Sequence, residues 1–252
     1  MSDFCVEQEE NFVYLKEGSE KIGGINPRDI NATPEDIITA FNTITNNYQL
    51  TQEAIKEIIQ RVHTQGNIIG FERTLLMFCY FCKTIVDNNG EGITNVVNSL
   101  KRHINYDNNY DNILHDIFVV EIGSKYADKK KIKINISKKE KGYDFCIDEF
   151  KCECKIRLGY LNGNQFLNEE KLEKLLIDLV RKEFRSIRKK VIDAFFKQGA
   201  DIVFIDTKRT NLGYFLTLQS LSEPPEPEKY SLILYSSNQV KSHWMKIFIF
   251  SG

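Results

Sequence analysis

The apolar residues of this chain change their spacing partway along, and this change limits the folds that the chain can adopt. Residues 33–105 repeat apolar side chains at helical spacing, with Thr33 and Thr51 as candidate N-caps. Residues 131–158 instead alternate apolar and polar side chains, which is typical of strands. Together the two patterns predict a protein of the α/β (α+β) class with a mostly helical N-terminal region.

A polar run at 105–112 predicts a boundary between an N-terminal region, residues 1–108, and a second domain, residues 109–252. The first 30 residues carry only weak strand signals. The second domain reads in order as a helix, three strands, a long helix and a strand. These elements are expected at 113–127, 131–137, 142–147, 150–158, 168–199 and 200–207, with further strands at 213–220, 230–237 and 245–250.

The net charge of −1 conceals a division along the chain. Residues 1–124 hold 9 basic and 18 acidic side chains, whereas residues 125–200 hold 20 basic and 12 acidic ones. A basic segment in a nearly neutral chain is expected at a polyanion-binding site, although a solvated charged face would leave the same pattern. The acidic N-terminal region is instead expected to mediate dimerisation or to bind a partner protein.

No apolar run approaches the ~20 residues of a membrane helix. The N-terminus is acidic, where a signal peptide would be basic and then apolar. We therefore expect a cytoplasmic protein that does not contact membranes. In that compartment the 6 cysteines are expected to be free thiols, and Cys79 and Cys82 to belong to an apolar core helix rather than to a zinc site.

Charged side chains interrupt two of the predicted strands, in the stretch GYDFCIDEFKCECKIRLG at 142–159. A hairpin with a two-residue loop at 148–149 pairs residue 147 with 150 and places Asp144 directly opposite Glu153. A four-residue loop gives the same register, whereas a three-residue loop does not. The strand period of two then puts Glu153 and Lys155 on one face and leaves Cys152, Cys154 and Ile156 to the core.

Two opposed carboxylates on one sheet face destabilise it unless something offsets their charge. A divalent cation would do so, and Mg²⁺ (or Mn²⁺) takes one or two carboxylates together with waters and phosphate oxygens. A lysine beside such a site can stabilise the charge that develops during phosphodiester hydrolysis. The other interpretation is a charged pair of strands that simply faces solvent.

The spacing of Asp144, eight intervening residues and then Glu153-Cys154-Lys155 resembles the PD-(D/E)XK nuclease motif. The predicted element order, over about residues 110 to 207, is similar to the restriction-endonuclease-like core: a helix, a three-stranded antiparallel meander, a helix and a strand. Tyr143 replaces the usual proline before the aspartate. The resemblance implies that Asp144, Glu153 and the backbone carbonyl of Cys154 bind the metal and that Lys155 acts on the attacking water.

Two further sets of residues gain a role from this resemblance. In the predicted helix before the motif, Glu121 lies on the apolar stripe of Leu114, Ile117 and Phe118, where families with this fold often supply another acidic ligand. The alternative is a stripe-edge glutamate that reaches water. In the long helix after the motif, an ordinary solvated face competes with contacts to phosphates by Arg181, Lys182, Arg185, Arg188 and Lys189.

The resemblance implies a metal-dependent hydrolase, most simply a DNA endonuclease of prokaryotic restriction or antiviral defence. RNA remains open as a substrate. A different class would also explain the sequence: a catalytically silent nucleic-acid-binding protein, or a partner-dependent effector subunit of a defence or repair complex. The intact Asp144, Glu153 and Lys155 favour the enzyme.

Overall fold

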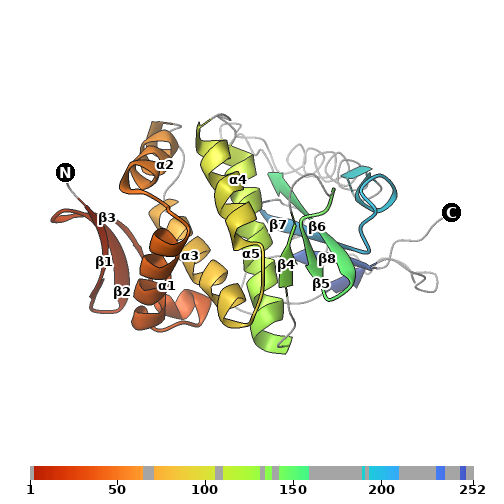
Figure 1. Cartoon of the computed structure of the whole chain (residues 1–252), viewed down its shortest axis with the longest axis horizontal. Coiled ribbons are helices and arrows are strands. Elements are labelled where there is room, and N and C mark those ends of the chain that lie inside the picture. The colour runs from red at the N-terminus through yellow and green to blue at the C-terminus, as the bar shows by residue number, and fades with distance from the viewer. Residues whose placement is uncertain are drawn as a thin grey trace, which may run out of the picture. The chain divides into compact units, whose positions relative to one another are not determined.

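The structure is a computed structural model, shown in Figure 1, and it forms two compact units, Met1–Lys138 and Lys139–Gly252. It describes residues 3–64, 71–105, 110–130, 134–137, 142–158, 189–190, 193–209, 231–235 and 245–247. Over these residues the fold is mixed α/β with two sheets, as the sequence predicts.

The first unit begins with an antiparallel sheet in the order β1-β2-β3. Its strands are β1 (Phe4–Glu9), β2 (Phe12–Glu17) and β3 (Glu20–Ile25). Val13 and Leu15 of β2 are completely buried, while Lys16 on the other face pairs with Glu7 and Glu9. The weak strand signals of the first 30 residues therefore correspond to a real sheet, and they are weak because short strands with one charged face contain few apolar residues.

Five helices follow in this unit, and the two predicted N-caps are confirmed. Thr33 and Asp36 form a capping box: the Asp36 amide donates to Thr33 Oγ1 at 3.2 Å, and the Thr33 amide donates to Asp36 Oδ2 at 2.9 Å. Thr51 Oγ1 accepts from the Ala54 amide at 3.2 Å. The helices are α1 (Pro34–Asn47), α2 (Gln52–Thr64), α3 (Phe71–Asp87), α4 (Ile93–Asn105) and α5 (Tyr110–Lys130).

Helix α3 is central to this unit, since it packs against α1, α5 and β3 (Figure 1). Cys79 and Cys82 are completely buried in it, which confirms the prediction of a core helix. Burial raises the pKa of the Cys79 thiol to about 12 and that of Cys82 well above its usual value. Both thiols therefore stay protonated and chemically inert.

The first unit ends later than the boundary predicted at 108. Helix α5 packs against α3 and α4, and the short strand β4 (Ile134–Ile136) bridges to Glu91, so that both elements belong with the N-terminal helices. The division falls between Lys138 and Lys139. The polar run at 105–112 is a local signal only and does not mark a break in packing.

The second unit contains strands in the order β5-β6-β7-β8-β9. Their bounds are β5 (Phe145–Ile147), β6 (Phe150–Leu158), β7 (Ile202–Arg209), β8 (Ser231–Tyr235) and β9 (Met245–Ile247). Strand β6 pairs antiparallel with β5 and parallel with β7, and β8 pairs parallel with β7 and antiparallel with β9. Most of the helix predicted at 168–199 and the whole strand predicted at 213–220 lie outside the described residues.

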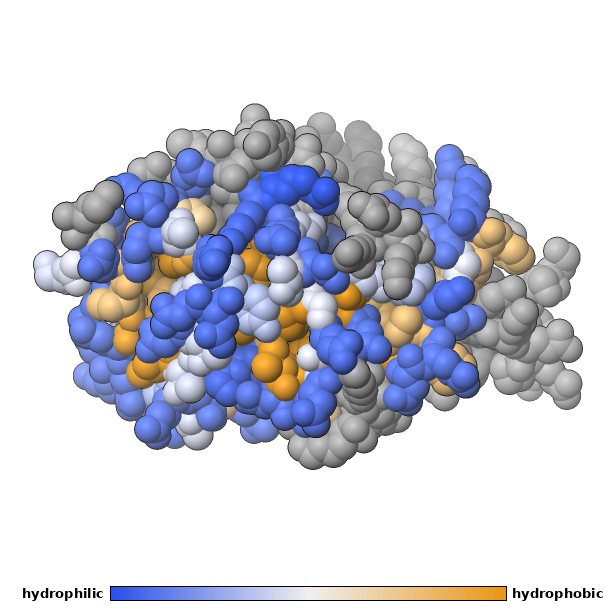
Figure 2. Space-filling model, viewed as in Figure 1, coloured by the Kyte–Doolittle hydropathy of each residue, from blue (hydrophilic) through white to orange (hydrophobic). Residues whose placement is uncertain are grey.

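The helices in the described part of the chain include none that is both long and apolar enough to cross a membrane. On the face seen in Figure 2, hydrophilic residues predominate and hydrophobic ones form small areas between them. Such scattered apolar exposure is normal for a protein surface.

Candidate active site

The hairpin of β5 and β6 has the register predicted from the sequence. Phe145 pairs with Cys152, Cys146 with Lys151, and Ile147 with Phe150. Residues 148 and 149 form the two-residue loop, in which Asp148 adopts a φ of 52°, a conformation that aspartate tolerates better than most residues. The ladder ends at the pair of Phe145 and Cys152, and Asp144 directly precedes it in the chain.

The two faces of β6 are both covered at this point. Cys152 and Cys154 are completely buried on one face, where the ring of Phe145 stacks on that of Phe204 from β7 at 5.8 Å. Glu153 faces the other way, and only 4% of its surface is exposed. The interpretation of a solvent-facing charged strand pair is therefore wrong for Glu153.

Lys155 offsets the charge of this buried glutamate. Its Nζ forms an ion pair with Glu153 Oε1, and the two side chains are 19% and 5% exposed. A buried carboxylate is tolerated only when it is paired or hydrogen-bonded. The sequence interpretation assigned this role to a divalent cation, but the protein supplies a cation of its own.

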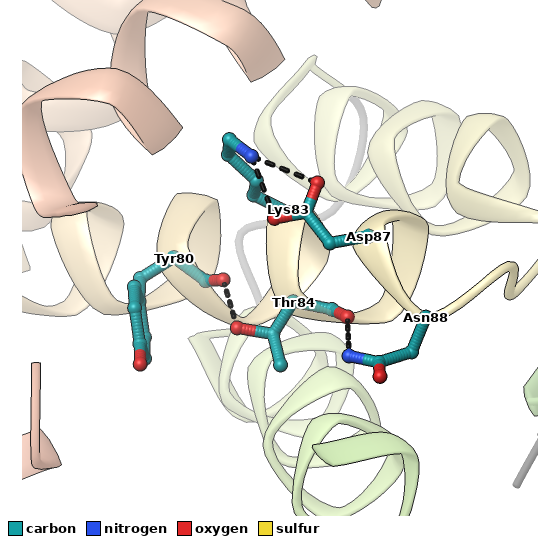
Figure 3. Close-up of polar contacts among 5 residues, drawn as sticks. All are labelled: Tyr80, Lys83, Thr84, Asp87 and Asn88. Atoms are coloured by element: carbon teal, nitrogen blue, oxygen red, sulfur yellow. Dashed lines mark hydrogen bonds and ion pairs between the residues drawn. The ribbon is translucent and has the colours of Figure 1, made fainter. Parts of the chain in front are cut away.

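An ion pair on α3 gives a scale for comparison (Figure 3). Lys83 Nζ donates to both Asp87 oxygens, at 2.8 and 2.6 Å, and these side chains are 23% and 55% exposed. Water competes for both partners of such a surface pair, which typically contributes less than about 1 kcal/mol. The Glu153–Lys155 pair differs because water has little access to the carboxylate.

Asp144 is held in a different way. Its Oδ2 accepts a hydrogen bond from the backbone amide of Cys154 at 2.6 Å, and its own amide donates to the Cys152 carbonyl at 2.9 Å. The N–H and C=O of one strand residue lie on the same side of the strand. The carbonyl of Cys154, predicted as a backbone ligand, therefore points to the side of β6 on which Asp144 lies.

The Cys154 thiol takes no part in chemistry at this site. Desolvation by burial, followed by the negative charges of Asp144 and Glu153, raises its pKa well above the usual value. Burial likewise raises the pKa of the Cys152 thiol. Neither thiol is a nucleophile at neutral pH, so Cys154 can contribute only through its backbone.

Around the loop that leads into Asp144, the structure has three features that sequence reasoning missed. Gly142 has a φ of 78°, and a Cβ built there would lie 3.7 Å from the carbonyl oxygen of Gln198. Lys151 Nζ lies 5.9 Å from the centre of the Tyr143 ring. Asp201 bonds to both backbone groups of Lys151, at 2.9 and 2.8 Å, and so fixes the start of β7 beside β6.

The described end of the long predicted helix contains an aspartate whose pKa is lowered by nearby lysines. The pKa of Asp193 is lowered first by its hydrogen bond to Lys197 and further by the charges of Lys189 and Lys155. Lys189 is exposed and helical. The remaining candidates for phosphate contact lie outside the described residues: Arg181, Lys182, Arg185 and Arg188.

Glu121 lies in α5 of the first unit and is buried. Its Oε1 pairs with Lys125 Nζ at 2.8 Å, one helical turn away. The interpretation of a glutamate that reaches water is therefore wrong, because only 10% of its side chain is exposed. Its role as an additional metal ligand stays a prediction.

The donors on the hairpin suit a magnesium ion in type, although they are few. Among the described residues, no group of three or more His, Cys, Asp or Glu side chains could hold a metal. Mg²⁺ needs only one or two carboxylates, since waters and substrate phosphate oxygens complete its coordination. Asp144, Glu153 and the Cys154 carbonyl are all hard oxygen donors and fit Mg²⁺ or Mn²⁺, provided that Lys155 moves away from Glu153.

Comparison of the chain with known protein families, with curated proteins and with solved structures gave no match.

Proposed function

We propose that this protein is a metal-dependent nuclease that hydrolyses phosphodiester bonds. The observation that carries the proposal is the buried Glu153 beside Lys155, with Asp144 bonded to the backbone amide of the intervening Cys154. Burying a carboxylate and an ammonium group together seldom stabilises a fold more than apolar residues would. A buried pair of this kind is therefore explained better by a function than by a gain in stability.

Each residue has a distinct task in this proposal. Asp144 and Glu153, with the Cys154 carbonyl, hold the metal, which when bound supplies electrostatic stabilisation at the phosphate. Lys155 stabilises the negative charge that develops on the attacking water and the phosphate oxygens. Asp144 also orients the strand edge through its bond to the Cys154 amide.

DNA is the proposed substrate, with RNA as the alternative. The 20 basic side chains between residues 125 and 200, against 12 acidic ones, support a polyanionic substrate of either kind. We propose a role as an endonuclease in prokaryotic restriction or antiviral defence.

A second candidate is a catalytically silent nucleic-acid-binding or partner-dependent effector subunit. It is favoured by the same ion pair, because Lys155 neutralises Glu153 without any metal. A protein that has lost its chemistry could keep the pair as part of its core.

Incubation of the purified protein with plasmid DNA and with RNA, in Mg²⁺, Mn²⁺ or EDTA, separates the two candidates. The enzyme cuts only with metal, and both Glu153→Gln and Lys155→Met abolish cutting, whereas Lys83→Met cuts like the wild type. Cleavage that persists in both site variants would show that the site is assigned wrongly. A wild-type protein that binds nucleic acid without cutting it in any metal would support the silent subunit.

A further inference from the structure

We propose that Lys155 and the metal ion occupy Glu153 in alternation, so that metal binding releases the lysine for the substrate. This inference rests on the proposed function and specifies how the same site is switched on. The observation behind it is the direct ion pair between Lys155 Nζ and Glu153 Oε1.

The buried position of Glu153 makes the two cations competitors. Its side chain is 5% exposed, so water cannot replace a cation that leaves it. A carboxylate in this setting strongly favours one positive partner, and a lysine and a divalent ion held at the same oxygens would repel each other. Whichever cation binds there therefore weakens the binding of the other.

The two carboxylates have partners of different kinds. Asp144 Oδ2 is bonded to a backbone amide of β6, which is fixed by the sheet. Lys155, by contrast, has a flexible four-carbon side chain that is 19% exposed. The charge on Asp144 therefore stays compensated during the exchange, while Lys155 can turn outward without unfolding the strand.

A displaced Lys155 can reach solvent, because its side chain is already 19% exposed in the ion pair. The ammonium group released from Glu153 can then meet a substrate phosphate, which is where the proposed reaction needs it. The ion pair thus keeps the lysine away from the substrate until the metal has arrived.

The test is Mn²⁺ binding without nucleic acid, measured by electron paramagnetic resonance at about pH 8, where glutamate is ionised. The proteins compared are the wild type, Lys155→Met, Lys155→Arg, Glu153→Gln and the control Lys83→Met. Lys83 also pairs with a carboxylate, but at the surface of α3. Circular dichroism verifies that each variant is folded.

Removing the competitor should tighten Mn²⁺ binding of Lys155→Met by about fivefold or more, the lower end of typical couplings between binding events. Lys155→Arg and Lys83→Met should bind like the wild type, and Glu153→Gln should bind much more weakly. If Lys155→Met binds no tighter while Glu153→Gln loses binding, the exchange is refuted and the proposed function stands. If no protein shows binding that depends on Glu153, both proposals fail.

Discussion

Neighbouring residues of β6, in the β5–β6 hairpin, have different roles: some pack in the core and others belong to the proposed site. Cys152 and Cys154 are buried thiols, whereas the residue between them is a glutamate paired with a lysine. Strand alternation alone separates these roles, since successive side chains point to opposite faces. Substitutions one position apart should therefore have different consequences.

Asp144 should show both a structural and a functional effect. Asp144→Ala leaves the Cys154 amide without its acceptor and should lower the free energy of unfolding by about 1–3 kcal/mol. Asp144→Asn keeps an acceptor oxygen and should be nearly as stable as the wild type, yet bind Mn²⁺ poorly. Urea denaturation followed by circular dichroism measures the first effect. Equal stability of the alanine and asparagine variants would argue against the hydrogen bond.

The cysteines should differ sharply in reactivity. Cys5 and Cys146 are partly exposed and should be alkylated by iodoacetamide in the native protein, as detected by mass spectrometry. Cys79 is buried, and its pKa is raised to about 12, so raising the pH from about 7 to about 9 should not make it react. Alkylation of Cys79 in native protein at the rate of Cys5 would contradict this packing.

At the scale of secondary structure, the sequence predicted elements whose signals are local. The caps at Thr33 and Thr51 and the register of the hairpin follow from a few adjacent residues, and the structure confirms them. The β1–β3 sheet gave only weak strand signals because its outward face is charged. The ion pair of Glu153 was not predictable, because it depends on which groups exclude water from one sheet face.

The capping box of α1 should make a pH-dependent contribution to stability. Hydrogen bonds from Thr33 lower the pKa of Asp36. The ionised Asp36 carboxylate therefore stabilises the folded protein at neutral pH, and this stabilisation is lost as the pH falls through the lowered pKa. Thr33→Ala should therefore cost about 1 kcal/mol at neutral pH and less in acid. Urea denaturation at both pH values measures the difference.

Thr51→Ala is the matched control for this prediction. Thr51 caps α2 through the amide of Ala54, and Ala54 occupies the helical position that Asp36 holds in α1. Its cost should therefore be similar at both pH values. A Thr33→Ala cost that stays constant with pH would contradict the proposed role of Asp36.

The loop before β5 should be sensitive to the loss of a glycine. Gly142 and Gly199 both have positive φ values, 78° and 68°, so alanine at either position should cost about 1–2 kcal/mol. Only Gly142 lies two residues from Asp144, and Gly142→Ala should also weaken Mn²⁺ binding. Thermal unfolding measures the stability of both variants. If Gly142→Ala and Gly199→Ala bind Mn²⁺ equally well, the loop does not position Asp144.

At the scale of the whole molecule, the two units have separate cores and opposite charge tendencies. Residues 1–138 include β1–β3, α1–α5 and β4, whose buried side chains pack on one another. A unit with its own core is expected to fold independently. The polar run at 105–112 suggested a boundary too early in the chain, because the polarity of a sequence does not show which helices pack together.

A fragment of residues 1–138 should therefore fold on its own. We expect a helical circular dichroism spectrum, cooperative unfolding in urea and no measurable affinity for DNA in a fluorescence anisotropy titration, since residues 1–138 carry 15 basic and 19 acidic side chains. The full chain should bind DNA more weakly as salt rises. Salt-sensitive DNA binding by the fragment would contradict this prediction, because it would show that the first unit itself binds nucleic acid.

The bond between Asp144 and the Cys154 amide also determines how an inactive protein for substrate trapping should be made. Aspartate is the usual choice for inactivation, but here its removal would also loosen the edge of β6. Glu153 and Lys155 neutralise each other, so replacing both at once with uncharged residues of similar size leaves no buried charge behind. A Glu153→Gln/Lys155→Met double variant is therefore the better protein for capturing uncut nucleic acid in a crystal.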